Sequence, residues 1–261
     1  MRDKITGFSL IEFSIVLLII GLLISGTLAG RHISHQAKLS DLAKSINKYL
    51  VAINSFKEFY GKYPGDYDEA YSIWGSDCID QGKCNGDADG NIELILSSGP
   101  VNTSDNDESF MAWKHLSLAQ MIKGSFTGAF AATTGTDVGV NIPESSFTGA
   151  GFSISNSIKY KQFNASSSSS TNFNSLNISR PNSSAAHETP NSDFISARDA
   201  RLLDVKIDDG IANSGILFGL TNDGSSAWCQ NSTTEVDKIT NSTNYLSSQT
   251  ATSCFLVYKI E

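Results

Sequence analysis

The motifs that identify common enzyme classes are missing from this 261-residue sequence. It contains no nucleophile elbow, no phosphate-binding glycine loop, no zinc-binding pair of histidines and no paired-carboxylate signature. His32 and His35 follow a long apolar run, where an interfacial role is favoured over catalysis, and His115 has no nucleophile or acid at motif spacing. The sequence therefore favours a protein that is not an enzyme, and we interpret His115 as structural.

Charge is also scarce, since charged residues make up 18% of the chain and the net charge is -8. Residues 31–60 carry five Lys or Arg against two acids, so the chain beyond Gly61 holds more than the whole negative excess. An acidic globular part argues against nucleic acid as a partner. The abundance of Ser, Asn, Thr, Gly and Asp suits a secreted, β-rich and loop-heavy surface.

Four cysteines lie beyond the apolar run, namely Cys78, Cys84, Cys229 and Cys254. An even number of cysteines in an exported domain indicates disulfides, and four of them allow three pairings. Sequence proximity favours Cys78–Cys84 and Cys229–Cys254. A zinc site is the rival interpretation, but Cys-x5-Cys is not a common zinc spacing and no nearby histidine completes it.

The N-terminus combines a short polar leader, residues 1–7, with an apolar run from Phe8 to Gly30. About 20 apolar residues span a bilayer as a helix, and the basic residues Arg2 and Lys4 place the leader in the cytoplasm. A secretory signal is the alternative, but its apolar core would be shorter and would be cleaved at its far end.

Glu12 is the one acid in this run. An ionisable residue in a membrane segment is costly and normally marks function, although an acid near the end of a segment is tolerated more easily. Its context, Gly7-Phe8-Ser-Leu-Ile-Glu12, resembles the type III signal of type IV pilins and type II secretion pseudopilins. Segments between about residues 60 and 220, such as CNGDADGNI, also look like a branch of prepilin-like proteins.

This resemblance implies specific roles for three residues. A prepilin peptidase of the inner membrane would cut after Gly7 and methylate the new terminal residue, Phe8. Glu12 would pair with the terminal amine of a neighbouring subunit during assembly. Such an amine has a pKa of about 8 and stays cationic when methylated. An ammonium and a carboxylate that enter an apolar filament core each need the other to offset their desolvation.

We expect four segments: a leader (1–7), a transmembrane and assembly helix (8–30), an amphipathic second half of that helix (31–60) and an exported domain (61–261). Gly61 and Pro64 suit the end of the helix. The fold class that the resemblance implies is α+β and pilin-like, with the helix packed on an antiparallel sheet that carries loop-rich insertions. The helical periodicity predicts one packed stripe, made of Leu39, Leu42, Ile46, Tyr49, Ile53, Phe56 and Tyr60.

The segment from Asn85 to Glu93 has oxygen-bearing side chains at alternate positions, with a glycine that turns the chain. This pattern resembles the first half of a Ca²⁺ loop. The usual glutamate at position twelve is replaced by Leu96. A solvated Asp/Gly turn is the favoured interpretation of so partial a motif, with no cofactor, and calcium is the alternative. Its candidate ligands are Asn85, Asp87, Asp89, Asn91 and Glu93.

Local patterns predict four further elements. A helix is expected from Asp107 to Lys123 and a long surface loop over the Ser-rich stretch 161–192. Ser196 and Asp199 form a capping-box pattern that opens a short helix through Val205. Residues 254–260 alternate as a strand does.

The sequence thus predicts a structural subunit, a pilin or pseudopilin that is major or minor, with the prepilin peptidase and other pilin subunits as partners. Before assembly it would cross the inner membrane once, with its leader cytoplasmic and its domain periplasmic. Afterwards it would belong to a periplasmic or cell-surface filament. The alternatives are an exported adhesin or binding protein anchored by the same signal, and a membrane-anchored enzyme with an unfamiliar site.

Overall fold

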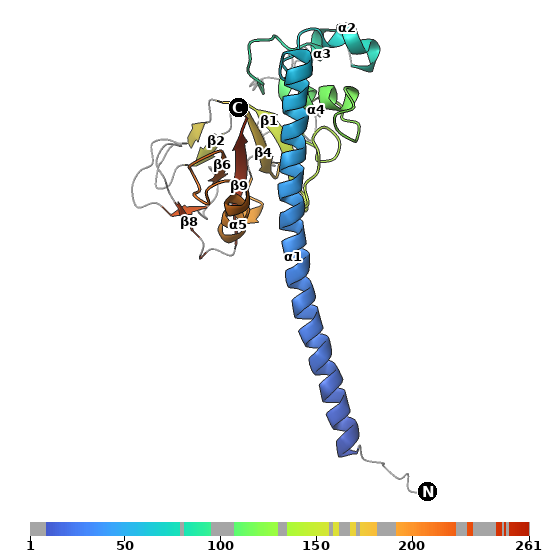
Figure 1. Ribbon diagram of the computed structural model, residues 1–261, viewed down its shortest axis with the longest axis vertical. Coiled ribbons are helices and arrows are strands. Elements are labelled where there is room, and N and C mark those ends of the chain that lie inside the picture. The colour runs from blue at the N-terminus through green and yellow to red at the C-terminus, as the bar shows by residue number, and fades with distance from the viewer. Residues whose placement is uncertain are drawn as a thin grey trace. The chain divides into compact units, whose positions relative to one another are not determined.

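The protein forms two compact units, Met1–Ser40 and Asp41–Glu261, and the boundary between them falls inside helix α1 (Leu10–Tyr60). Figure 1 shows the computed structural model. It describes residues 9–78, 81–94, 107–129, 135–156, 159–161, 168–170, 173–181, 192–222, 229–231, 244–246, 248 and 251–260.

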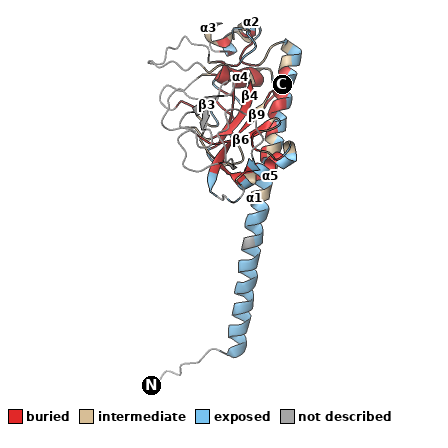
Figure 2. Ribbon diagram, turned by 90° about the vertical axis from the view of Figure 1, so that its left-hand side faces the viewer, coloured by how far each residue is buried: buried red, intermediate tan, exposed pale blue. Residues whose placement is uncertain are grey.

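Helix α1 continues unbroken from the apolar run into the amphipathic stretch, as the sequence predicts. Its last twenty residues belong to the second unit, and Figure 2 shows a buried stripe along them. Gly61 ends the helix because its φ of 78° is left-handed, and its N–H donates to the Lys57 carbonyl at 2.8 Å. Six of the seven predicted stripe residues are buried, and Tyr60 is half-buried.

The second unit is built on an antiparallel sheet in the order β1-β4-β9-β5, with β6 also paired to β9. Tyr49 of α1 packs edge-on against Phe152 of β1, with ring centroids 4.8 Å apart. A long helix on an antiparallel sheet confirms the predicted α+β class. The strands of this sheet are β1 (Gly151–Ser155), β4 (Ser175–Ser179), β5 (Ile195–Ser196), β6 (Leu217–Leu220) and β9 (Thr252–Lys259).

Strand β4 corrects the prediction of a surface loop over residues 161–192. All five of its residues are buried between β1 and β9. Leu176 and Ile178 alternate with Ser175, Asn177 and Ser179, and these polar side chains are satisfied inside the sheet; the Ser175 hydroxyl, for example, donates to the Ser155 carbonyl at 2.8 Å. Serine-rich composition hid a period-two pattern that the fold uses.

Short helices follow α1 in the chain: α2 (Ala70–Trp74), the 3-10 helix η1 (Gly75–Asp77) and α3 (Gln81–Cys84). Helix α4 (Glu108–Leu118) is shorter than the predicted helix 107–123. The difference arises because Gln120 adopts a left-handed φ of 57°, which an α-helix does not allow. Trp113 of α4 contacts Tyr49 edge-on, with ring centroids 5.0 Å apart.

The C-terminal part follows its predicted signals closely. The Ser196 hydroxyl caps α5 (Ala197–Ile207) by accepting the Asp199 N–H at 3.2 Å, and the helix runs two residues past the predicted end. Both disulfides have the connectivity that sequence proximity favoured, Cys78–Cys84 and Cys229–Cys254. Two small hairpins complete the described elements, β2 (Lys159–Lys161) with β3 (Ser168–Ser170) and β7 (Gln230–Asn231) with β8 (Asn244–Tyr245).

Candidate functional site

The start of α1 is closed by a reciprocal capping box that was not predicted from the sequence. The Ser9 N–H donates to Glu12 Oε2 at 2.8 Å, and the Ile11 N–H donates to the Ser9 hydroxyl at 3.4 Å. The Ser-x-x-Glu spacing was the readable signal for this arrangement. Glu12 is therefore oriented by its own helix, and its side chain is exposed. Gly7 and Phe8, the predicted processing residues, lie outside the described residues.

The first unit presents apolar side chains in every direction. From Leu10 to Ile24, twelve large apolar residues are exposed, and no part of the most apolar 18-residue window is buried. By length and composition, α1 is the one helix among the described residues that could cross a membrane. A buried core helix passes the same test of composition, but the exposure of this segment excludes that interpretation.

The second unit contains an acidic cluster around the predicted calcium segment. One oxygen each of Asp66, Asp87 and Asp89 lie within 4.8 Å of one another, and the same holds for Asp87, Glu93 and Glu108. Asp66 and Glu108 were not predicted to take part because they lie far from the loop in sequence. We define these five residues as the acidic cluster.

The predicted ligands play different parts in this loop. The Asp89 N–H donates to Asp87 Oδ1 at 3.1 Å, and Asn91 donates to Asp89 from its backbone at 2.7 Å and from its amide at 3.0 Å. Asn85 is turned elsewhere, because its Oδ1 accepts the Tyr71 N–H at 2.8 Å. Three of the five predicted ligands, Asp87, Asp89 and Glu93, thus belong to the acidic cluster. Asn91 holds Asp89 in place through its two hydrogen bonds, and Asn85 lies outside the cluster.

Glu108 and Asp66 form the buried side of the acidic cluster. Glu108 accepts the N–H groups of Asp87 and Glu93 at 3.1 and 3.2 Å, which fixes both ends of the loop. Burial raises the pKa of Glu108 to about 8. Burial, helped by the charges of Asp89 and Asp87, raises the pKa of Asp66 to about 6.

His115 is structural, as predicted. Its ring is fully buried, Nδ1 accepts the Gly65 N–H at 3.0 Å and Nε2 contacts the Cys84 carbonyl oxygen at 2.9 Å. Burial lowers the pKa of His115 to about 4, so the ring is neutral at pH 7. Cys78 and Cys84 lie close enough to suggest a metal site with it, but their sulfurs form a disulfide.

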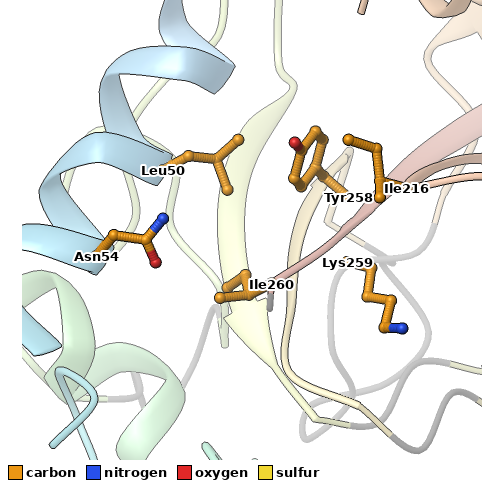
Figure 3. Close-up of a pocket in the computed structure, with 6 residues that line it drawn as sticks. All are labelled: Leu50, Asn54, Ile216, Tyr258, Lys259 and Ile260. Atoms are coloured by element: carbon orange, nitrogen blue, oxygen red, sulfur yellow. The ribbon is translucent and has the colours of Figure 1, made fainter. Parts of the chain in front are cut away.

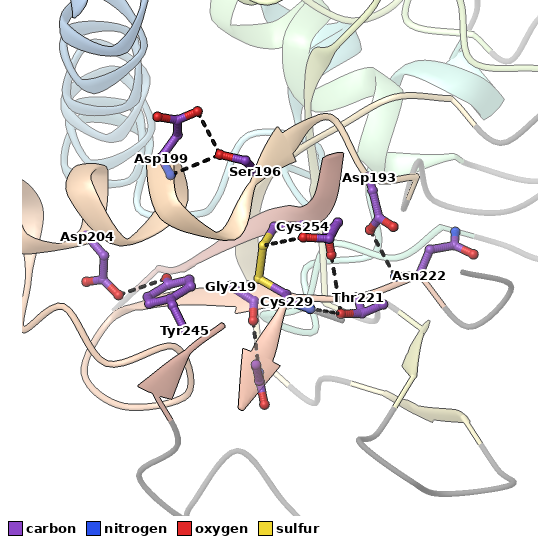
Figure 4. Close-up of a disulfide and its surroundings, with 12 residues drawn as sticks. Asp193, Ser196, Asp199, Asp204, Gly219, Thr221, Asn222, Cys229, Tyr245 and Cys254 are labelled. Atoms are coloured by element: carbon purple, nitrogen blue, oxygen red, sulfur yellow. Dashed lines mark hydrogen bonds between the residues drawn. A yellow bond between two sulfur atoms is a disulfide. The ribbon is translucent and has the colours of Figure 1, made fainter. Parts of the chain in front are cut away.

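Asp204, Asp208 and Asp209 form a second acidic group. Figure 4 shows Asp204 in the surroundings of the Cys229–Cys254 disulfide. Tyr245 donates its hydroxyl to Asp204 at 2.8 Å, and the Gly210 N–H donates to the same carboxylate at 3.2 Å. Burial raises the pKa of Asp204 to about 7. Because protein groups already bind this carboxylate, it serves to fix the turn after α5.

One pocket of about 290 Å³ lies between α1 and the end of β9. Figure 3 shows that apolar and polar side chains share its walls and that the Lys259 amine is directed away from Leu50 and Asn54. It offers no pair of groups suited to acid–base or nucleophilic chemistry among its lining residues, which are Leu50, Asn54, Ile216, Tyr258, Lys259 and Ile260.

Comparisons of the chain with protein-family models, with curated proteins and with solved structures found no significant match.

Proposed function

We propose that this chain is a structural subunit of a type IV pilin-like filament, either a pilin or a type II secretion pseudopilin. A prepilin peptidase would process it between Gly7 and Phe8, and it would assemble through the first part of α1. The observation that carries the proposal is the apolar surface of that part of α1, which is exposed all round and bears Glu12 at its start.

Such a surface is unfavourable in water, at about 25 cal/mol for each Å² of apolar area. A lipid bilayer or a bundle of identical helices removes it from water equally well. The same segment therefore suits both states of a filament subunit, the membrane-inserted state before assembly and the packed state in the filament. An anchor alone would need only the first state.

The surroundings of Glu12 distinguish the membrane-inserted state from the filament state. In lipid near the membrane surface, its carboxylate can be hydrated and can cap its own helix, as its bond to the Ser9 N–H illustrates. In a filament core, it would need a cation, and the terminal ammonium of a neighbouring subunit is available once the leader is removed. The exposed position of Glu12 is compatible with that partner.

The two disulfides of the second unit support export, because such bonds persist in oxidising compartments such as the periplasm. We therefore propose a single pass through the inner membrane with a cytoplasmic leader and a periplasmic domain. After assembly the subunit would belong to a periplasmic or cell-surface filament.

An exported adhesin or binding protein with the same anchor is the competing function, and fractionation of cells separates the two. Cells are sheared, and the chain is quantified by immunoblot in the released fibres and in the membranes. A pilin should enter the sheared fibres, and a major pilin should dominate them, whereas a pseudopilin should appear in filaments released from the periplasm. Recovery of the chain from membranes alone, with none in the surface fibres and none in periplasmic filaments, would contradict the proposal.

A further inference from the structure

The side chain of Asp66 is fully buried, yet only one of its oxygens has a partner. Oδ2 accepts the Gly90 N–H at 3.1 Å, whereas Oδ1 is buried without any hydrogen bond. A buried carboxylate oxygen that binds nothing is costly, and native structures leave few of them without a reason. An ion bound at this oxygen would supply the reason.

The neighbours of Asp66 have the spacing of an ion site. One oxygen each of Asp66, Asp87 and Asp89 lie within 4.8 Å of one another. Calcium binds oxygens at about 2.3–2.6 Å, so two ligands on opposite sides of one ion stand about 5 Å apart. The spacing of the three oxygens is therefore compatible with a single Ca²⁺ ion between them.

The negative charge of the acidic cluster also favours binding of a cation. Besides Glu108, four carboxylates belong to the cluster. Among the described residues, Lys62 supplies a positive charge close by, and its amine donates to the Ala88 carbonyl at 2.9 Å. One ammonium leaves most of the negative charge unbalanced. Asp87 and Asp89 are exposed while Asp66 is buried, so the cluster has one side toward solvent and one side inside the protein.

The backbone holds this arrangement closely. A side chain at Gly86 would collide with the Gly65 carbonyl and with the backbone of Asp66, so the loop rests directly on the segment that carries Asp66. Gly90 adopts a left-handed φ of 96° and turns the chain after Asp89. Ile92 is fully buried and anchors the far end of the loop.

We propose that Asp66, Asp87 and Asp89 bind one Ca²⁺ ion, with Glu93 and Glu108 completing its acidic surroundings. Calcium is favoured over magnesium because the site draws on carboxylates from separate segments, and calcium accepts such irregular oxygen sets whereas magnesium demands a near-ideal octahedron. The ion would join the chain that follows α1, the loop 85–93 and the start of α4. This inference goes beyond the proposed function and does not depend on it.

The test uses the full chain in a mild nonionic detergent, stripped with EGTA and titrated with CaCl2 or MgCl2 in a calorimeter. Wild-type protein should bind one Ca²⁺ per chain and bind Mg²⁺ at least tenfold more weakly. At a hundredfold excess over the dissociation constant, calcium should raise the melting temperature by about 5–10 °C.

Two substitutions in the segment that follows α1 give a matched comparison. Asp66→Asn removes the buried charge and should weaken calcium binding at least tenfold, with the calcium-induced rise in melting temperature reduced in step. Asp68→Asn makes the same chemical change at an exposed position two residues away and should change the affinity by less than twofold. If Asp66→Asn does not fold, Asp89→Asn at the exposed rim of the site replaces it.

Three results would overturn the proposal. They are an absence of saturable binding and of any thermal shift in wild-type protein at millimolar CaCl2, equal affinity for Mg²⁺ and Ca²⁺, and equal weakening by Asp68→Asn and Asp66→Asn. Because none of these measurements involves filaments, they leave the proposed function untouched.

Discussion

The substitution Glu12→Gln should prevent filament assembly as thoroughly as Glu12→Ala. Glutamine can still accept the Ser9 N–H in a capping box, whereas alanine cannot, so the two variants differ in the local bond and share only the loss of charge. If the carboxylate balances a neighbouring terminal ammonium, either variant leaves that ammonium unpaired in apolar surroundings. Breaking such a buried pair costs about 3–5 kcal/mol.

That cost corresponds to a decrease on the order of 10²–10³-fold in the equilibrium for adding a subunit. The measurement is the ratio of chain in sheared fibres to chain in membranes. Glu58→Gln provides the control, because it removes one carboxylate from an exposed position near the other end of α1 and should assemble normally. Normal fibres from Glu12→Gln, with a defect confined to Glu12→Ala, would show that Glu12 acts only as a helix cap.

The substitution Phe56→Ala should remove a large part of the stability of the second unit. Phe56 is fully buried and stacks on His115 at an interplanar angle of 8°. The centroid of its ring also lies 4.4 Å from that of Tyr60 and 6.2 Å from that of Trp74. Truncating a buried phenylalanine to alanine costs about 3–5 kcal/mol. Domains of this size have a total stability of about 5–15 kcal/mol.

We expect a lower urea midpoint for Phe56→Ala, followed with the chain in detergent through its tryptophan fluorescence, to which Trp74 and Trp113 contribute. Phe59→Ala is the matched control, since Phe59 lies three residues further along the same helix and is 77% exposed. Its midpoint should change by the equivalent of less than about 1 kcal/mol. Equal shifts for the two variants would contradict the packing of α1 described above.

Regular local patterns made much of the fold predictable. The apolar stripe of α1 follows from the helical period, the stop at Gly61 from its freedom to adopt positive φ, and the cap at Ser196 from its side chain. The Cys229–Cys254 bond followed from proximity in the sequence, and the terminal strand from alternation. Each of these signals acts over a few residues or relies on a scarce residue type.

Features that depend on distant residues were missed. Strand β4 is buried because β1 and β9 cover it, and its own Ser-rich composition carries no sign of those neighbours. Asp66 and Glu108 come close to the loop 85–93 only after folding brings three segments of the chain together. By contrast, the Ser9–Glu12 capping box was present in the sequence as a four-residue pattern and could have been predicted.

In the function that we propose, the working form of this protein begins at Phe8 and assembles through α1. Intact-mass measurement of the chain purified from sheared filaments or from membranes tests it most directly. We expect a mass that lacks residues 1–7 and includes one additional methyl group on the new terminal amine. A mature protein in which Phe8 is still joined to Gly7 would contradict it.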